Sequence, residues 1–91
     1  MLDVRYSSQF RKDFKLAQKR GLPIDELKDV IKRLAAEKPL EAKFYDHQLK
    51  GKYSSFRECH IRPDWLLIYR IDQEELVLIA QRTGSHSDLF D

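Results

Sequence analysis

The sequence predicts an α+β fold in which two N-terminal helices pack on one face of a small antiparallel β-sheet. The predicted element order is β-α-α-β-β-β, followed by a short C-terminal turn. Two observations predict it: residues 8–38 carry two helical stripes of apolar side chains, and residues 55–83 hold three strand-like segments joined by short turns. Because a chain of 91 residues can bury one core, we expect residues 1–91 to form a single domain.

The first strand and the first helix are marked by a change in apolar spacing. Residues 2–6 alternate apolar and polar side chains, which indicates a short strand with one buried face. Ser7 or Ser8 can cap the helix that follows, and Gly21 ends it. The stripe of this helix has helical spacing and consists of Phe10, Phe14 and Ala17.

The second helix is predicted to begin at Pro23 and to end at Pro39. Its core-facing stripe consists of Leu27, Val30, Ile31, Leu34 and Ala35. No period holds between residues 40 and 53, so we expect an irregular, basic connection there. Long connections of this kind are often functional in a compact domain.

Three strands are expected to form an antiparallel meander in the C-terminal half. Residues 55–62 alternate, residues 65–71 are rich in aromatic and β-branched side chains, and residues 76–83 form the last strand. After Gly84, residues 85–88 can cap a short helical turn. With both helices on one face of this sheet, the other face is left for solvent or a ligand. The polar side chains expected there are Glu58, His60, Arg62 and Arg82.

Composition and charge exclude several classes of protein. The longest apolar run, residues 65–69, falls far short of the roughly 20 residues of a membrane span, and no apolar leader begins the chain. The single cysteine cannot form an internal disulfide, so we expect a cytoplasmic protein with no membrane partner. The net charge is only +2, but residues 1–20 and 42–63 are basic blocks that the fold can bring together as one surface for an anion.

Three histidines outside the helical stripes are the candidate proton carriers: His47, His60 and His86. Their spacing matches no zinc signature, so we expect no metal and no other cofactor. A nucleophilic pair of Cys59 and His60 is disfavoured because adjacent strand residues point to opposite faces. Imidazoles with basic and aromatic neighbours suit RNA cleavage, in which a ribose 2′-hydroxyl attacks the adjacent phosphorus and needs a base, an acid and a cation.

Four segments resemble the YafQ branch of the RelE-type bacterial toxins. They are LAQKR at residues 16–20, YDHQLKGKY at 45–53, FRECHIRPDWLLIY at 56–69 and RTGSHSDLF at 82–90. The patterns DH-x-L-x-G, H-x-x-PDW and RTG-[ST]-H-x-x-LF are specific in combination, and the resemblance extends over almost the whole chain. It implies a RelE-like fold.

The resemblance also implies a function and its partners. It implies the toxin of a bacterial type II toxin–antitoxin system, a ribosome-dependent endoribonuclease that cuts mRNA in the A site of the 30S subunit and so inhibits translation. The products would carry a 2′,3′-cyclic phosphate and a 5′-hydroxyl, and no metal would be required. The implied partners are a cognate antitoxin, ribosomal RNA and mRNA, and the antitoxin complex would bind operator DNA.

By this resemblance the catalytic positions are His47, His60, Asp64, Arg82 and His86. His86 is expected to protonate the leaving oxygen, while His60 and Asp64 act on the 2′-hydroxyl, although the division between acid and base stays open. Arg82 would bind the scissile phosphate, and His47 would support charge. The expected substrate-binding residues are Trp65, Phe90, Lys50 and Lys52, and the expected ribosome-binding residues are Arg11, Lys12, Lys15, Lys19 and Arg20. Glu58, on the same strand face as His60, could orient that imidazole, but it is expected to be an ordinary surface carboxylate.

Two other functions are compatible with the same fold. One is a ParE-like toxin that binds and poisons DNA gyrase without nuclease chemistry, and the other is an inactive partner that only represses. The three histidines and the Asp64-Trp65 pair favour the nuclease, because a pure binding protein needs no proton carriers. The nuclease hypothesis therefore requires that the three imidazoles gather on one face of the sheet, beside Arg82.

Overall fold

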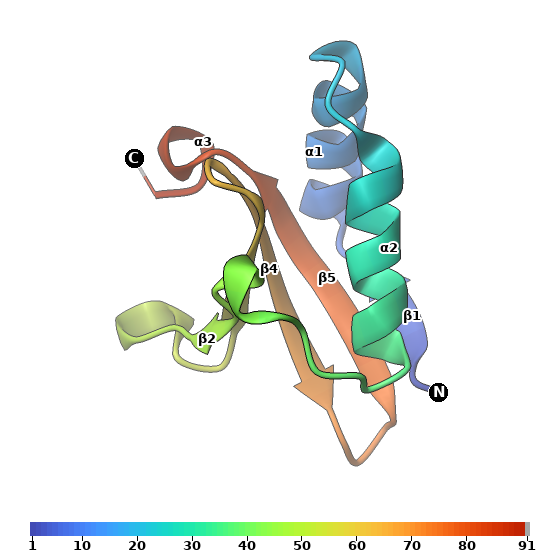
Figure 1. The fold of residues 1–91 in the computed structure, drawn as a ribbon. Helices are drawn as coiled ribbons and strands as arrows, with labels where there is room; N and C mark the ends of the chain where they lie inside the picture. The colour runs from blue at the N-terminus through green and yellow to red at the C-terminus, as the bar shows by residue number, and fades with distance from the viewer. Residues whose placement is uncertain (91) are drawn as a thin grey trace.

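The computed structural model describes residues 1–90, so Asp91, the last residue of the predicted domain, lies outside the described residues. Figure 1 shows the helices and the sheet in this part of the chain. The elements, in chain order, are β1 (Asp3–Tyr6), α1 (Ser8–Lys19), α2 (Ile24–Ala35), the 3₁₀ turn η1 (Ala42–Phe44), β2 (His47–Gln48), the 3₁₀ turn η2 (Gly51–Tyr53), β3 (Arg57–Arg62), β4 (Trp65–Asp72), β5 (Val77–Gly84) and α3 (His86–Phe90).

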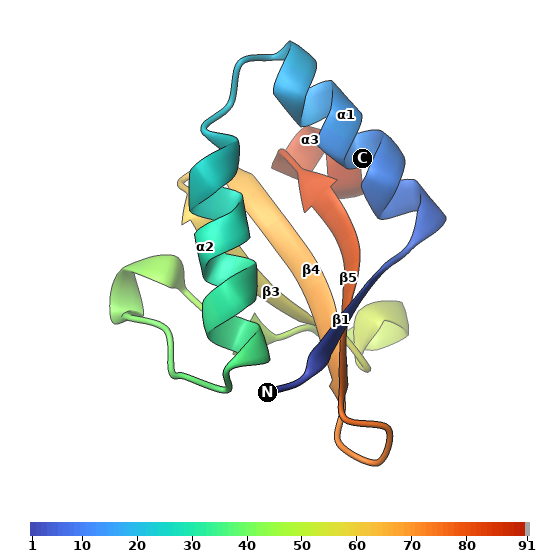
Figure 2. The same ribbon diagram turned by 90° about the vertical axis from the view of Figure 1, so that its right-hand side faces the viewer.

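The strands form one sheet in the order β1-β5-β4-β3-β2, and Figure 2 shows α1 and α2 together on one face of it. The predicted antiparallel meander of β3, β4 and β5 is confirmed. The sheet as a whole is mixed rather than purely antiparallel, because β1 pairs in parallel with β5. A fifth strand, β2, pairs with β3 inside the segment that was expected to be irregular. Alternation of side chains predicts that a strand exists, but it does not predict the direction of its neighbour.

The helix ends follow local capping chemistry. The Oγ atom of Ser7 accepts a hydrogen bond from a backbone N–H of α1 at 2.9 Å, and Gly21, with φ +73°, ends that helix as predicted. Pro23 is the cap of α2 rather than its first residue. The helix ends at Ala35, before Pro39, because Glu37 adopts the left-handed conformation of a helix stop, with φ +57°.

The main core lies between the two helices and the sheet. Most of the predicted stripe residues are buried there, and Phe14 packs against them partly exposed. From β4, alternate side chains face the helices: Trp65, Leu67 and Tyr69. No helix among residues 1–90 is long and apolar enough to cross a membrane.

The other face of the sheet is only partly open. Leu66 and Ile68 of β4 form a small apolar cluster with Leu89 of α3, and Leu49 and Phe56 pack against it. Figure 1 shows the β2 segment and α3 on the side of the sheet away from α1 and α2. We expected this face to be open to solvent or a ligand. Part of it is covered instead, because the apolar side chains that β4 presents there are buried by α3 and by residues next to β2 and β3. What stays accessible is a narrower polar strip beside β3.

Candidate active site

The three histidines gather on the face of the sheet opposite α1 and α2. His47 of β2 stands across from Glu58 of β3, and its Nε2 atom lies 3.0 Å from Oε2 of Glu58. His60, two residues further along β3, points to the same face as Glu58. The rings of His60 and His86 lie 5.7 Å apart, centroid to centroid. The predicted convergence of the three imidazoles is confirmed.

Asp64 holds the imidazole of His86. It lies in the turn between β3 and β4, where its Oδ1 atom is 2.8 Å from Nδ1 of His86 and accepts the backbone N–H of the same residue at 3.1 Å. These two hydrogen bonds hold the pKa of Asp64 below its usual value, and the bond from the backbone N–H of His86 has the larger effect. The carboxylate therefore faces His86, which corrects the expectation that Asp64 acts together with His60. The reason is geometric: the β3–β4 turn lies beside the first residue of α3.

The short helix α3 is fixed by a capping box and an ion pair. Ser85 and Asp88 exchange hydrogen bonds between side chain and backbone, at 3.0 and 3.1 Å. Asp88 also accepts a hydrogen bond from Arg20, at the end of α1, at 2.7 Å. The Arg20 guanidinium and then the Ser85 N–H lower the pKa of Asp88 to about 2. This arrangement positions His86 and Phe90, the two site residues that α3 carries.

Hydrogen-bond partners distinguish the three imidazoles. The Nδ1 atom of His60 faces the carbonyl oxygen of Pro63 at 3.3 Å. Because a carbonyl only accepts, Nδ1 carries the proton and Nε2 of a neutral His60 keeps its lone pair. Both nitrogens of His47 face acceptors, since Nδ1 lies 2.7 Å from the carbonyl oxygen of Tyr45 and Nε2 faces Glu58. The doubly protonated form of His47 thus donates two hydrogen bonds.

The segment that carries His47 is anchored to the sheet through its neighbour Asp46. The hydroxyl of Tyr69 donates to Oδ1 of Asp46 at 2.5 Å, and Nε of Arg57 lies 3.4 Å from the same oxygen. Tyr69 itself is buried, and burial raises the pKa of its hydroxyl, so the hydroxyl remains a donor. The irregular connection is therefore fixed at the point where it delivers an imidazole.

Glu58, expected to be a surface carboxylate, is a further functional candidate. It is buried, with 6% of its surface exposed, and its Oε1 atom has no hydrogen-bond partner among residues 1–90. A buried carboxylate in the middle of three imidazoles is not an ordinary surface charge. The sequence signal for a role in the site was the position of Glu58 two residues before His60, on the same face of β3.

The geometry bears on two other chemistries, a metal site and a cysteine nucleophile. Glu58, His60 and His86 each offer a ligand atom within 4.8 Å of the others, so these three could hold a metal ion although their sequence spacing matches no signature. The thiol of Cys59 is fully buried on the other face of β3, and burial raises its pKa. The expectation that this thiol is no nucleophile agrees with that burial.

Aromatic and basic side chains border the histidines. Phe90 is 42% exposed, and its ring lies 6.4 Å from that of His86 and 5.9 Å, edge on, from that of Tyr53. Lys52 places its ammonium 5.3 Å from the centre of the Tyr53 ring, and Lys50 is exposed beside it. Phe90 and Lys52 thus lie near the histidines through His86 and Tyr53, and Tyr53 is an aromatic neighbour that the sequence analysis did not name.

Two predicted residues are placed differently. Trp65 is buried in the core on the helical side, with 3% of its surface exposed, so the expectation that it stacks on a base is wrong for this structure. The reason is that Trp65 shares the face of Leu67 on β4 rather than that of His60. Arg82 is engaged by Asp13 of α1, which accepts from its Nε at 2.8 Å and its Nη2 at 3.2 Å. Nη1 of Arg82 makes no hydrogen bond within residues 1–90, and no hydrogen bond or ion pair joins Arg82 to a histidine there. The expectation that the three imidazoles lie beside Arg82 is therefore not confirmed.

The basic residues of α1 lie in the helical layer, on the other side of the sheet from the histidines. Arg11, Lys12, Lys15 and Lys19 are exposed, and Arg11 and Lys15 line a groove between α1 and α2. Arg20 is the exception, because its ion pair with α3 connects the two layers. The two basic blocks therefore do not merge into one flat surface. They lie on two sides of the molecule (Figure 1).

Residues 2–91 match a protein-family model described as "Bacterial toxin of type II toxin-antitoxin system, YafQ". The chain belongs to the YafQ family. The mRNA interferase toxin YafQ of Escherichia coli strain K12 is 42% identical over 89 residues, which cover 97% of this chain and 95% of that relative. The E. coli DinJ-YafQ complex matches with a TM-score of 0.91 and 40% identity over 100% of both chains. A metal-bound toxin from Helicobacter pylori matches with a TM-score of 0.94 and 47% identity, over 99% of this chain and 100% of that one.

Proposed function

We propose that this YafQ-family protein is an endoribonuclease that cuts mRNA in the ribosomal A site. The observation that carries the proposal is the pair of imidazoles of His60 and His86, whose ring centres lie 5.7 Å apart. Their Nδ1 atoms have different partners, the carbonyl oxygen of Pro63 for His60 and the carboxylate of Asp64 for His86. His60 can accept a proton at Nε2, and His86, held by Asp64, can donate one. An acid and a base on two sides of one phosphodiester are what RNA cleavage without an external nucleophile requires. The E. coli relative is named an mRNA interferase, which supports this substrate.

The proposed reaction is an attack within the RNA. Nε2 of His60 takes the proton of a ribose 2′-hydroxyl, and the 2′-oxygen forms a bond to the adjacent phosphorus. The bond from phosphorus to the 5′-oxygen breaks, and His86 gives its Nε2 proton to that oxygen. The products carry a 2′,3′-cyclic phosphate and a 5′-hydroxyl.

The remaining residues stabilise charge or hold the strand. The imidazolium of His47, beside Glu58, and the Nη1 group of Arg82 are proposed to stabilise the crowded phosphate. Phe90 and Tyr53 offer ring faces to bases, and Lys50 and Lys52 bind flanking phosphates. None of these steps uses a metal ion, so we propose that the reaction is metal-independent.

The ribosome and an antitoxin are the proposed partners. Few residues surround the histidines, so we propose that the ribosome aligns the 2′-oxygen and that the basic α1 residues bind ribosomal RNA. The E. coli homologue forms a complex with DinJ, which supports a cognate antitoxin for this chain as well. That complex is proposed to bind operator DNA, and the toxin to act in the cytoplasm, where mRNA is translated.

Primer extension on mRNA in a reconstituted translation reaction tests the proposal. Wild-type protein and a Ser87→Ala control, which changes an exposed neighbour on α3, should give codon-phased cuts. His86→Ala, with an unchanged circular dichroism spectrum, should give none. Intact mRNA with wild-type protein would overturn the proposal, and double-strand DNA breaks in cells with intact mRNA would indicate a gyrase poison instead. Equally fast cutting of naked RNA would overturn the dependence on the ribosome.

A further inference from the structure

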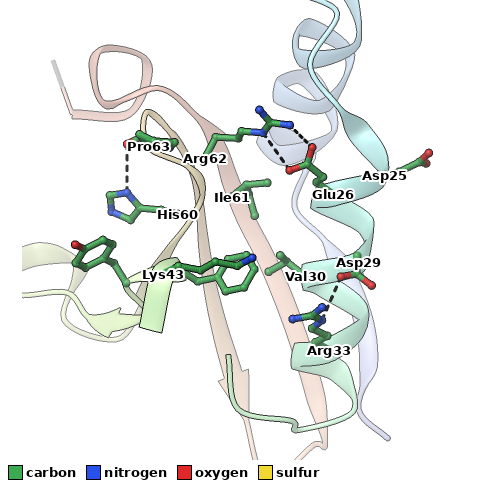
Figure 3. Close-up of a pocket in the computed structure, with 12 residues that line it drawn as sticks. Asp25, Glu26, Asp29, Val30, Arg33, Lys43, His60, Ile61, Arg62 and Pro63 are labelled. Atoms are coloured by element: carbon green, nitrogen blue, oxygen red, sulfur yellow. Dashed lines mark hydrogen bonds and ion pairs between the residues drawn. The ribbon is translucent and has the colours of Figure 1, made fainter. Parts of the chain in front are cut away.

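A cavity of about 790 Å³ lies beside His60, between β3, α2 and η1 (Figure 3). Val30 of α2, Phe44 of η1 and Ile61 of β3 give it an apolar lining. His60 belongs both to this cavity and to the histidine cluster, so the cavity continues the candidate active site. Its size is within the range of small-molecule sites and is ample for a nucleobase.

Two carboxylates of α2 that line the cavity, Glu26 and Asp29, form ion pairs, whereas Asp25 forms none within residues 1–90. Arg62 forms an ion pair with Glu26, and Nε of Arg33 lies 3.1 Å from Oδ2 of Asp29. The pairing of Arg62 follows from a register shift after His60, which turns Arg62 away from the histidine face where alternation predicted it. A recess with apolar side chains and carboxylates in its lining suits a flat uncharged group better than a phosphate.

Lys43 supplies a cation close to this recess. Its side chain is 71% exposed and its ammonium lies 4.0 Å from a carboxylate oxygen of Glu41. Figure 3 shows the Lys43 side chain between His60 and α2. Such an exposed, loosely held ammonium can turn toward a phosphate of a bound strand.

Tyr45 is the aromatic residue at the His60 end of the cavity. Its side chain is 70% exposed, and its ring centre lies 5.6 Å from that of His60. Its φ of +46° is left-handed, an unfavourable conformation for a bulky residue and one that tends to mark functional sites. Its carbonyl oxygen meanwhile faces Nδ1 of His47 at 2.7 Å. The backbone of Tyr45 thus helps to position one histidine while its exposed ring lies beside another.

We propose that Tyr45 and this cavity bind the nucleobase of the nucleotide that carries the attacking 2′-hydroxyl, an inference that rests on the proposed function. The ribose of that nucleotide lies at His60, because His60 takes its proton. Its base then extends away from His86, onto the ring of Tyr45 and over the apolar lining. Lys43 binds the phosphate on the 5′ side of this nucleotide. Because every base has an aromatic face, the site accepts any base.

The activity test compares Tyr45→Ala with Tyr45→Phe in the reconstituted translation reaction. Tyr45→Ala should lower kcat/KM for mRNA cleavage about tenfold, mainly through KM, and Tyr45→Phe should keep it within about twofold of wild type. Product ends should stay 2′,3′-cyclic in both variants. Tyr6→Ala, which removes another exposed tyrosine at the end of β1, is the matched control and should cut like wild type.

A binding test uses the DNA dinucleotide d(ApG), which lacks the 2′-hydroxyl and so cannot be cut. In NMR spectra of the full chain, the dinucleotide should shift the backbone amides of Lys43, Phe44 and Tyr45, and Tyr45→Ala should weaken these shifts. Shifts confined to the Phe90 side would overturn the inference, as would wild-type kcat/KM in Tyr45→Ala. Failure of the wild-type protein to cut mRNA would overturn the proposed function and this inference together.

Discussion

The Oε2 atom of Glu58 lies 3.0 Å from Nε2 of His47, whereas Oε1 of the same carboxylate is buried without a hydrogen-bond partner within residues 1–90. Leaving a buried polar atom without a partner costs about 1–3 kcal/mol. The position of Glu58 among three imidazoles therefore indicates a role in the site rather than in stability.

Replacement of Glu58 by glutamine tests this directly. We expect Glu58→Gln to lower the cleavage rate by about 100-fold, since the negative charge among the histidines is lost. The free energy of unfolding, measured with urea, should stay the same or rise, because a neutral amide is easier to bury. A large loss of stability together with activity would show that Glu58 has a structural role instead.

Removal of the Tyr69 hydroxyl should loosen the segment that carries His47. Tyr69→Phe leaves the carboxylate of Asp46 without its shortest hydrogen bond, so the free energy of unfolding should fall by about 1–3 kcal/mol. Cleavage should also slow, because Asp46 positions its neighbour. Tyr6→Phe, which changes an exposed ring, should alter neither quantity. Unchanged urea midpoints for Tyr69→Phe would contradict the anchoring role.

Asp88 should make the fold sensitive to acid in a defined window. Its pKa is lowered from 3.8 to about 2 by Arg20 and the Ser85 N–H, so its contribution to stability is present above pH 4 and is lost as the pH falls toward 2. The wild-type free energy of unfolding should decline across this window more than that of Asp88→Asn. Parallel pH profiles for the two proteins would show that the ion pair contributes nothing.

Chelation and metal addition test whether Glu58, His60 and His86 act in cleavage without a metal ion or as ligands of one. Because the proposed steps use side chains alone, EDTA should leave the cleavage rate unchanged. Added Zn²⁺ should slow cleavage, since Glu58, His60 and His86 could bind it and His60 could then no longer accept a proton. Loss of activity with EDTA, restored by a metal ion, would contradict metal-independent cleavage.

Elements set by local signals were predictable from the sequence. Both helices, the Ser7 cap and the β3–β5 meander follow from apolar spacing and capping residues near them in the chain. The gathering of His47, His60 and His86 was predicted as a requirement of the nuclease hypothesis and is confirmed in space, whereas their roles are proposals.

Features that depend on distant pairing were not predictable. The parallel pairing of β1 depends on a partner strand more than seventy residues away, as Asp3 and Val77 show. The partner of Asp64 depends on where α3 begins, and the burial of Trp65 depends on the face that β4 turns toward the helices. Glu58 is buried because other segments of the chain pack over it, and the alternation of side chains along β3 does not predict such packing.

An RNA with sulfur in place of the scissile 5′-oxygen gives the most direct test of the central claim, that His86 is the acid and His60 the base. A thiolate leaves without a proton, so on this RNA, placed in the ribosomal A site, His86→Ala should cut within about tenfold of the wild-type rate, while His60→Ala should remain inactive. If His86→Ala stays as inactive on the sulfur RNA as on the ordinary one, His86 does not protonate the leaving group and the proposed division of roles is wrong.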